Sequence, residues 1–359
     1  MTLLSASTLP EIAAANGDAV SVPGYPLEDR KVGIVHFGVG GFHRAHQAYY
    51  LNRLFDAGHP AEWAVCGVGL MPADAAMRDA LTAQDGLYTF AAKFPDGNRE
   101  ASVIGSIAEY LFAPDDPEQV LARMTDPAVR IVSLTVTEGG YNYNPSTGEF
   151  QYETPAVAAD LDADFEGGET YPQTMFGYVV EALRRRREAG VEPFTVLSCD
   201  NVRGNGHLAK EMVLAFTRRK DEQTHAEPLA GWIEQNVAFP NCMVDRITPV
   251  TSDEDRAMIA EDYGIEDAWP VVSEDFIQWV LEDDFPTGRP AFEEVGVQMV
   301  QDVEPYEMMK LRLLNCSHQA IAYFGLLLGH TRPRGLHRPG ADPLHPLPLH
   351  GRRGHSHRP

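Results

Sequence analysis

The alternation of short apolar runs with helix-forming segments constrains the fold of this chain more than any other feature. Val, Ile, Leu and Phe, which strands favour, are concentrated in residues 31–39, 62–70, 130–138 and 193–201. Helical patterns occupy residues 43–58, 117–126 and 174–190 between them. Strands that alternate with helices predict βαβ units and a mostly parallel sheet, and continuously apolar strands indicate a sheet covered on both faces. We therefore expect an α/β protein with a doubly wound sheet.

The first apolar run leads directly into a glycine-rich turn at residues 38–43 (GVGGFH). Gly38 permits a tight turn, Gly40 lets the backbone approach a pyrophosphate, and the following helix supplies N–H donors for its charge. His43 stands at the third position of the G-x-G-x-x-G pattern, where Gly or Ala is usual, so the motif alone is a weak signal. Because the turn lies in the first βα unit, we expect a Rossmann-like domain whose cofactor-binding residues include Gly38, Gly40, Gly41 and Phe42.

An acidic residue, Asp74, comes shortly after the second apolar run. An acid at this place hydrogen-bonds the adenosine ribose hydroxyls of a dinucleotide and repels a 2′-phosphate. Asp74 therefore favours NAD over NADP as the cofactor. The alternative is that Asp74 caps the helix predicted to begin there, and the two roles are compatible.

A second group of polar residues interrupts an apolar helix pattern. Residues 305–329 place Leu, Met, Ile, Tyr and Phe in nearly every direction around a helix, which predicts a largely buried helix. Lys310, Asn315 and His318 break this pattern, and at about 100° per residue Asn315 lies about 140° and His318 about 80° from Lys310. Burial lowers the pKa of a lysine, which suits a general base. The alternative is a lysine whose stem lies along the core while its ammonium reaches water.

The charge balance excludes two classes of partner. The 359 residues include 29 Lys and Arg against 52 Asp and Glu, a net charge of −23, so a nucleic acid or an anionic membrane would repel the chain. The N-terminus lacks the pattern of a secretory signal, and no apolar run approaches the ~18 residues of a membrane helix. We expect a cytoplasmic protein that binds neither nucleic acid nor membrane.

Metal and disulfide chemistry find little support in the sequence. The cysteines form no C-x-x-C pair, and we expect reduced core thiols; they are Cys66, Cys199, Cys242 and Cys316. His43 and His46 have the spacing of metal ligands, but no third ligand accompanies them. We therefore expect no metal site.

Several uncommon motifs occur together and in order: GVGGFHRAHQAYY, TVTEGGYNYN, SCDN, FPNCMVDRITP, WPVVSEDFIQWVLEDDF and a K-x4-N-x2-H spacing. Over residues 25–329 they make the chain resemble the polyol-specific long-chain dehydrogenases, the mannitol dehydrogenase family. The resemblance implies metal-independent hydride transfer between NAD and a polyol or ketose, such as D-mannitol and D-fructose, in a monomeric protein. It also implies an NAD-binding domain over residues 1–300 and the first helix of a mostly helical substrate domain over residues 301–329.

The resemblance assigns roles to the catalytic candidates. Lys310 is similar to the family's general acid/base, and Glu307, one helical turn earlier, to a carboxylate that relays protons to water. Asn315 matches the asparagine that hydrogen-bonds the reacting oxygen, Asn201 in SCDN matches a second one, and His318 matches a residue that positions substrate and lysine. An amine that takes the hydroxyl proton and amides that stabilise the developing oxyanion are the groups that polyol oxidation requires.

Two further residues are assigned by the same resemblance. Asp245 in MVDR is similar to a family aspartate near the substrate, and its alternative interpretations are an ion pair with Arg246 and a helix cap. Cys316 lies between the polar residues of the helix, where we interpret it as a packing variant.

The chain changes character after residue 329, where the resemblance stops. Residues 331–359 hold six Arg, six Pro and five His with one acidic residue, and proline at this density forbids a regular helix. Residues 330–359 could be a His-rich metal-binding tail, a basic arm or, as the abrupt change favours, non-native sequence after a frameshift. We expect the truncated domain to expose Leu326, Leu327 and Leu328. The alternatives to a mannitol enzyme are a fructuronate reductase, a dehydrogenase of another polyol, or an inactive nucleotide-binding remnant.

Overall fold

The computed structural model describes residues 1–165, 170–223 and 227–329. The chain divides into two compact units, which we call unit 1 (Met1–Glu304) and unit 2 (Pro305–Pro359). Within the described residues, no helix is long and apolar enough to cross a membrane.

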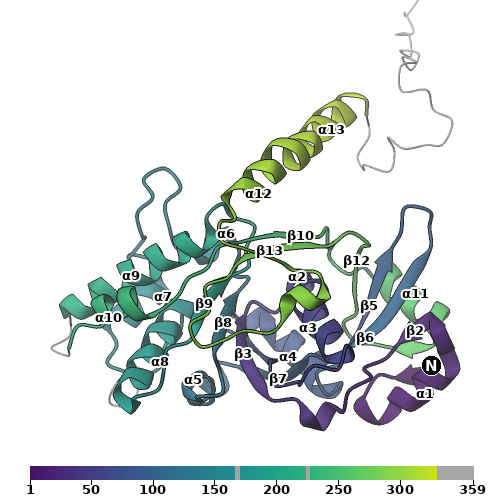
Figure 1. The fold of residues 1–359 in the computed structure, drawn as a ribbon, viewed down its shortest axis with the longest axis horizontal. Coiled ribbons are helices and arrows are strands. Elements are labelled where there is room, and N and C mark those ends of the chain that lie inside the picture. Colours follow the sequence, from purple (N-terminus) through teal and green to yellow (C-terminus); the bar gives the residue numbers. More distant parts are fainter. Residues whose placement is uncertain (166–169, 224–226, 330–359) are drawn as a thin grey trace, which may run out of the picture. The chain divides into compact units, whose positions relative to one another are not determined.

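Unit 1 is built on a five-stranded, fully parallel sheet with the strand order β7-β4-β3-β8-β9 (Figure 1). Its strands are β3 (Val32–Phe37), β4 (Ala64–Gly69), β7 (Ile107–Phe112), β8 (Ile131–Leu134) and β9 (Thr195–Ser198). Val35 on the central strand β3 pairs with Cys66 on β4 and with Val132 on β8. This strand order is that of a Rossmann-like, doubly wound sheet, so the predicted fold class is confirmed.

Helices cover both faces of this sheet. Side chains of a strand alternate between its two faces, and Val35 and Phe37 lie in one buried apolar cluster while Ile34 lies in another. The first cluster includes residues of α5 (Pro117–Thr125), α7 (Pro155–Asp162), α8 (Met175–Ala189) and α9 (Asn205–Gln223). The second includes residues of α2 (Gly41–Ala45), α3 (Gln47–Asp56) and α4 (Ala75–Ala83). Burial on both faces explains why most residues of these strands are apolar.

The helix predicted over residues 43–58 is divided in two. His46, with φ −121° and ψ −86°, ends α2 and precedes α3. Both nitrogens of its ring have partners: Nε2 lies 2.8 Å from the carbonyl oxygen of Gln278, and Nδ1 lies 2.9 Å from the side-chain nitrogen of Gln47. The uninterrupted helix that the sequence predicted is therefore wrong at this residue.

Further strands form three smaller sheets in unit 1. A four-stranded sheet has the order β12-β5-β6-β2, a three-stranded sheet has the order β10-β13-β14, and β1 pairs with β11. In Figure 1 the four-stranded sheet lies on the opposite side of the molecule from α7, α8 and α9. The strands are β1 (Thr2–Leu3), β2 (Val20–Ser21), β5 (Tyr88–Lys93), β6 (Arg99–Ile104), β10 (Cys242–Asp245), β11 (Ile265–Glu266), β12 (Val271–Glu274), β13 (Gln278–Glu282) and β14 (Gln298–Val300).

The remaining helices of unit 1 are short or peripheral. The α-helices are α1 (Leu9–Asn16), α6 (Thr137–Gly140), α10 (Ala230–Asn236) and α11 (Asp253–Tyr263). Single turns of 3-10 helix occupy Ala6–Thr8, Gly17–Ala19, Leu27–Asp29, Pro72–Asp74 and Phe292–Val295.

The described part of unit 2 is one irregular helix. It consists of α12 (Glu304–Met309), a π-helical turn at Lys310–Asn315 and α13 (Cys316–Leu327). The prediction of a largely buried helix is wrong, because in the described part of unit 2 no other helix or strand packs against it. Leu326, Leu327 and Leu328 are 70%, 83% and 58% exposed, so the expected exposure of these three residues is confirmed.

The four cysteines are free thiols, as the sequence predicts. Cys66, Cys199 and Cys242 are buried, and burial raises the pKa values of Cys66 and Cys199 well above the ordinary value of a thiol. Cys316 is exposed, so the expectation of a core thiol is wrong for this cysteine in the described structure.

Candidate functional site

The carboxyl ends of β3 and β8 form the centre of the candidate site. The chain proceeds from β3 to β4 on one side and reaches β8 on the other, so the strand order reverses at β3. Open parallel sheets bind ligands in the crevice at such a reversal, outside the carboxyl ends of the strands. The glycine-rich turn follows β3, and residues 135–137 follow β8.

Gly38 is required where the two turns meet. Its φ is +93°, and a Cβ built on it would lie 2.2 Å from the carbonyl oxygen of Thr135. The hydroxyl of Thr135 donates to the carbonyl oxygen of Gly38 at 2.7 Å. Only glycine satisfies both the backbone angle and the close approach, so the turn after β3 is held directly against the turn after β8.

The next residues leave room beside the turn. A Cβ on Gly40 would meet nothing closer than the carbonyl oxygen of Gly38 at 3.8 Å, and one on Gly41 would meet Thr248 at 3.4 Å. Gly40 precedes α2, whose first N–H groups have no partner within the helix. Phe42 is half-buried and stacks on the ring of His46, with the ring centroids 4.9 Å apart.

His43 replaces the third glycine of the pattern by filling the space between helix and strand. Its ring stacks on the ring of His36 from β3 at 3.5 Å, and both residues are buried. His36 lies 2.8 Å from the Ser133 hydroxyl and 2.9 Å from the Thr135 hydroxyl, both on the β8 side. Burial lowers the pKa of His36 to about 3 and also lowers the pKa of His43, so both rings are neutral at neutral pH. The third glycine normally lets helix and strand approach closely; here two neutral rings separate them.

Asp74 lies at the carboxyl end of β4, beside the same crevice. Its Oδ2 accepts hydrogen bonds from the backbone N–H groups of Leu70 at 3.0 Å and Met71 at 2.8 Å. Asp74 immediately precedes α4, but its side chain caps no N–H group of that helix. The capping interpretation is therefore wrong: the carboxylate fixes the preceding turn instead.

Asn201 follows β9, and Asp245 is the last residue of β10. Asn201 is exposed, two residues beyond the buried Cys199, and Asp245 is half-buried. The guanidinium of Arg246 donates to the carbonyl oxygens of Ala45 and Glu274 and lies over the rings of two aromatic residues, Tyr49 and Phe90. These contacts account for the burial of Arg246.

Unit 2 carries Glu307, Lys310, Asn315 and His318. The first three are half-buried, and the side chain of His318 lies outside the described structure. A π-helical turn runs from Lys310 to Asn315, and such a turn bonds residue i to residue i+5. Lys310 and Asn315 therefore lie nearer to the same side than the separation of about 140° expected in a regular α-helix. Single π turns in helices are frequent at functional sites.

Two features of the crevice gave no signal in the sequence. Thr137, three residues after the end of β8, has a φ of +64°, and the buried carboxylate of Asp200 accepts the N–H groups of Val136 and Thr137. A threonine in a left-handed conformation cannot be recognised from its residue type, because β-branched residues avoid that region. Asp200 stands in the SCDN motif, in which the sequence predicts a role for the neighbouring Asn201 alone.

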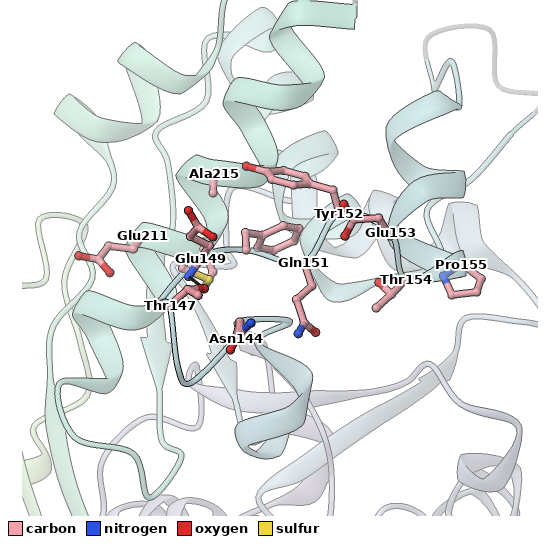
Figure 2. Close-up of a pocket in the computed structure, with 13 residues that line it drawn as sticks. Asn144, Thr147, Glu149, Gln151, Tyr152, Glu153, Thr154, Pro155, Glu211 and Ala215 are labelled. Carbon is pink, nitrogen blue, oxygen red and sulfur yellow. Dashed lines mark hydrogen bonds between the residues drawn. The ribbon is translucent and has the colours of Figure 1, made fainter.

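A separate surface hollow lies between the segment 144–155 and α9 (Figure 2). It encloses about 980 Å³ and carries the carboxylates of Glu149, Glu153 and Glu211. No residue predicted to bind cofactor or substrate lines it. The hollow is therefore distinct from the crevice at β3 and β8.

Comparison with known proteins identifies the family of the chain. The Mannitol dehydrogenase Rossmann domain matches residues 32–294, and the Mannitol dehydrogenase C-terminal domain matches residues 302–332. The chain belongs to the mannitol dehydrogenase family. Two similar proteins are the Mannitol 2-dehydrogenases of Phaeosphaeria nodorum, 52% identical over 327 residues, and Aspergillus clavatus, 51% identical over 330 residues. These alignments cover 90% and 91% of this chain but 55% and 64% of the relatives, so this family member spans a little over half to two thirds of their length.

Solved structures of family members have the same fold. The ternary complex of Pseudomonas fluorescens mannitol 2-dehydrogenase with NAD and D-mannitol matches with a TM-score of 0.83 at 45% identity, covering 92% of this chain and 64% of that one. A substrate-free D-sorbitol dehydrogenase matches with a TM-score of 0.83 at 45% identity, covering 92% of this chain and 65% of that one. In this mannitol dehydrogenase family member, the Rossmann-like sheet places Gly38, Gly40, Asp74 and Asn201 at the carboxyl ends of β3, β4 and β9.

Proposed function

We propose that this protein is an NAD-dependent polyol dehydrogenase that interconverts D-mannitol and D-fructose. The observation that carries the proposal is the crevice at β3 and β8 in a chain that is 45% identical, with a TM-score of 0.83, to a dehydrogenase solved with NAD and D-mannitol. Relatives that are 52% and 51% identical bear the name Mannitol 2-dehydrogenase, which supports the same substrate.

The residues of the crevice fit a dinucleotide. Gly38 keeps the turn tight, and the open space at Gly40 and Gly41 lets a pyrophosphate approach the backbone and the first N–H groups of α2. Phe42 borders this turn. The Oδ1 atom of Asp74 accepts no bond from a described residue and is available for ribose hydroxyls. A carboxylate there repels a 2′-phosphate, so we assign NAD rather than NADP.

The catalytic roles follow from the chemistry of the candidates. NAD, when bound, supplies the acceptor of the hydride that leaves C2 of the polyol. Lys310 in its neutral form takes the proton of the C2 hydroxyl, and the amide groups of Asn201 and Asn315 donate to the oxygen as negative charge develops on it. Glu307 passes the proton from Lys310 to water. In the reverse direction, Lys310 returns the proton to the ketose oxygen.

Two residues complete the substrate site in this proposal. His318 orients the substrate and Lys310, and the carboxylate of Asp245 accepts hydrogen bonds from polyol hydroxyls. We further propose that residues 1–300 form the NAD-binding domain and residues 301–329 begin the substrate domain, in keeping with family matches over residues 32–294 and 302–332. The tail at residues 330–359 lies outside the described structure.

D-Sorbitol is the second candidate substrate. It is favoured by the match to a D-sorbitol dehydrogenase at the same 45% identity and TM-score of 0.83. The two polyols differ in configuration only at C2, the carbon that loses the hydride, so a comparison of their rates tests how the site orients that carbon.

Titration and steady-state assays of the full chain test the proposal. We expect NADH to quench protein fluorescence and to bind more tightly than NADPH, and NAD to be reduced with D-mannitol faster than with D-sorbitol. Lys310→Met is expected to bind NADH like the parent and to lose turnover by at least a thousandfold, whereas Lys31→Met, a change in unit 1 before β3, should alter neither. A folded chain without NADH binding would refute the proposed cofactor, and binding without turnover would identify a nucleotide-binding remnant.

A further inference from the structure

Thr137 has a backbone conformation that threonine rarely adopts. Its φ of +64° lies in the left-handed region, where a β-branched residue is strained unless its surroundings hold it. The residue lies at the carboxyl edge of the sheet, three residues after the end of β8. Thr135, two residues earlier, is in direct contact with Gly38. Strain at this point therefore occurs in the wall of the proposed dinucleotide crevice.

The carboxylate of Asp200 holds the strained turn from the neighbouring strand. Its Oδ1 accepts the N–H group of Thr137 at 2.8 Å, and its Oδ2 accepts the N–H group of Val136 at 3.1 Å. Asp200 is 7% exposed, so water competes little for these bonds. Two successive N–H groups bound by one carboxylate fix the peptide between them.

A third donor completes the environment of the carboxylate. Tyr141, from the end of the same turn, donates its hydroxyl hydrogen to Oδ2 of Asp200 at 2.7 Å. The hydroxyl of Ser198 lies 2.6 Å from the same phenol oxygen and can donate to it. Burial raises the pKa of Asp200, and the hydrogen bonds from Tyr141, Thr137 and Val136 oppose that rise. These three donors are neutral groups, so the carboxylate is held by hydrogen bonds and not by a cation.

The backbone of Asp200 is fixed as firmly as its side chain. The Asn205 amide donates to the carbonyl oxygen of Asp200 at 3.0 Å and to that of Cys242 at 2.8 Å. Its oxygen accepts the N–H groups of Cys242 at 3.0 Å and Gly206 at 2.8 Å. Asn201 follows Asp200 directly and precedes Asn205 by four residues. Hydrogen bonds therefore hold the chain on both sides of Asn201.

We propose that Asp200 is a positioning residue: by holding Thr137 in its strained conformation, it fixes the turn that packs against Gly38 and aligns the adjoining Asn201. The inference rests on the proposed function, because it needs a dinucleotide at Gly38 and a reacting oxygen near Asn201. It adds a role for a carboxylate that touches neither ligand.

A general contribution to stability is the competing explanation, and Thr137→Gly separates the two. Glycine adopts a positive φ without strain, so a turn that carries glycine at position 137 no longer needs Asp200 to offset a conformational penalty. In Asp200→Asn, whichever way the amide is oriented, its NH2 group faces a backbone N–H group. A positioning role predicts that Thr137→Gly restores function to Asp200→Asn, whereas a general stabilising role predicts no restoration.

The experiment compares the full chain with Asp200→Asn, Thr137→Gly and the double variant. In Asp200→Asn we expect the amides of Val136 and Thr137 to exchange hydrogen at least tenfold faster and NADH to bind at least tenfold more weakly. With D-mannitol, kcat falls more than tenfold while KM changes by less than threefold, because Asn201 acts on the transition state. The double variant should recover NADH binding to within threefold of the parent.

Other outcomes would overturn either the role of Asp200 or the proposed function. Unchanged NADH affinity in a folded Asp200→Asn overturns the inference, as does a double variant that recovers nothing. If the parent binds no NADH, the proposed function fails, and the amide exchange of Asp200→Asn still shows whether the carboxylate holds the turn. If Asp200→Asn does not fold, Tyr141→Phe replaces it: this variant loses one donor to Asp200, should bind NADH about threefold more weakly, and should be restored by Thr137→Gly. Unchanged binding in Tyr141→Phe, or no restoration, would then overturn the inference.

Discussion

The glycine-rich turn has two requirements, close packing against Thr135 and room for a ligand. Replacement of Gly38 or Gly40 by alanine should separate them. A Cβ at Gly38 would lie 2.2 Å from the carbonyl oxygen of Thr135, at a residue whose φ is +93°. Gly40 has a φ of −112°, and its Cβ would meet nothing closer than 3.8 Å. Alanine at position 38 must therefore displace the turn after β8, whereas alanine at position 40 disturbs only a ligand that approaches the backbone.

The structure gives the size of each effect. A positive φ costs alanine about 1–2 kcal/mol, and displacing a packed neighbour adds about 1–3 kcal/mol, so Gly38→Ala should lower the free energy of unfolding by about 2–5 kcal/mol. Gly58→Ala is the matched control, because Gly58 has a φ of +95° and nothing within 4 Å of its Cβ. It should lose the backbone contribution alone, about 1–2 kcal/mol. Gly40→Ala should be as stable as the parent or more stable by up to about 1 kcal/mol.

Urea unfolding and NADH titration of the same preparations provide the assay. We expect Gly58→Ala to bind NADH like the parent, Gly40→Ala to bind at least tenfold more weakly at undiminished stability, and Gly38→Ala to lose both stability and binding. If Gly38→Ala were no less stable than Gly58→Ala, the close approach to Thr135 would be refuted. If Gly40→Ala bound NADH like the parent, the pyrophosphate would not pass this turn.

Three further changes test other parts of unit 1. Burial lowers the pKa of His36 to about 3 and also lowers the pKa of His43. Because both rings bind protons more readily in the unfolded chain, the folded state is fully stable above about pH 6.5 and loses stability as the pH falls towards 3. His43→Phe should remove up to about 1.4 kcal/mol per pH unit of that loss, and urea midpoints with the same pH dependence as the parent would contradict this. The guanidinium of Arg186 donates to buried backbone carbonyls, so Arg186→Met should lower the free energy of unfolding by at least about 3 kcal/mol. Arg218 forms an exposed ion pair, so the control Arg218→Met should lower it by less than about 1 kcal/mol. Equal losses in the two variants would contradict the stabilising role of the buried bonds. Asp160→Asn should cost about 1–3 kcal/mol in thermal unfolding, because its carboxylate accepts two backbone N–H groups and a hydroxyl, and an unchanged midpoint would rule out that role.

The central sheet could be predicted because its strands are buried on both faces. The apolar runs that contain β3, β4, β8 and β9 are continuous, and helices separate them in the sequence. The four-stranded sheet gave no such signal, because β12 pairs with β5 across about 180 residues of intervening chain. Neither strand shows in its own residues which distant strand it will meet.

The candidate site was predictable where residue type determines backbone shape. Gly38 indicates a positive φ, but Thr137 does not, and its conformation depends on a carboxylate about sixty residues away in the sequence. The angular positions assigned to Lys310 and Asn315 assumed a regular α-helix, and the π turn changes them. The roles of these two residues stay predictions, as do those of Asn201 and Asp245.

The pairing of β1 with β11 has a consequence for the order in which the chain folds during synthesis. Thr2 and Leu3 pair with Ile265 and Glu266, so the first strand waits until some 260 residues have followed it out of the ribosome. At about 5–20 residues per second, this delay lasts roughly ten to fifty seconds. The five parallel strands are all available by Ser198 and can associate earlier. Thr2 and Leu3 can therefore pair only after the central sheet is complete, and until then chaperones and proteases can reach this end of the chain.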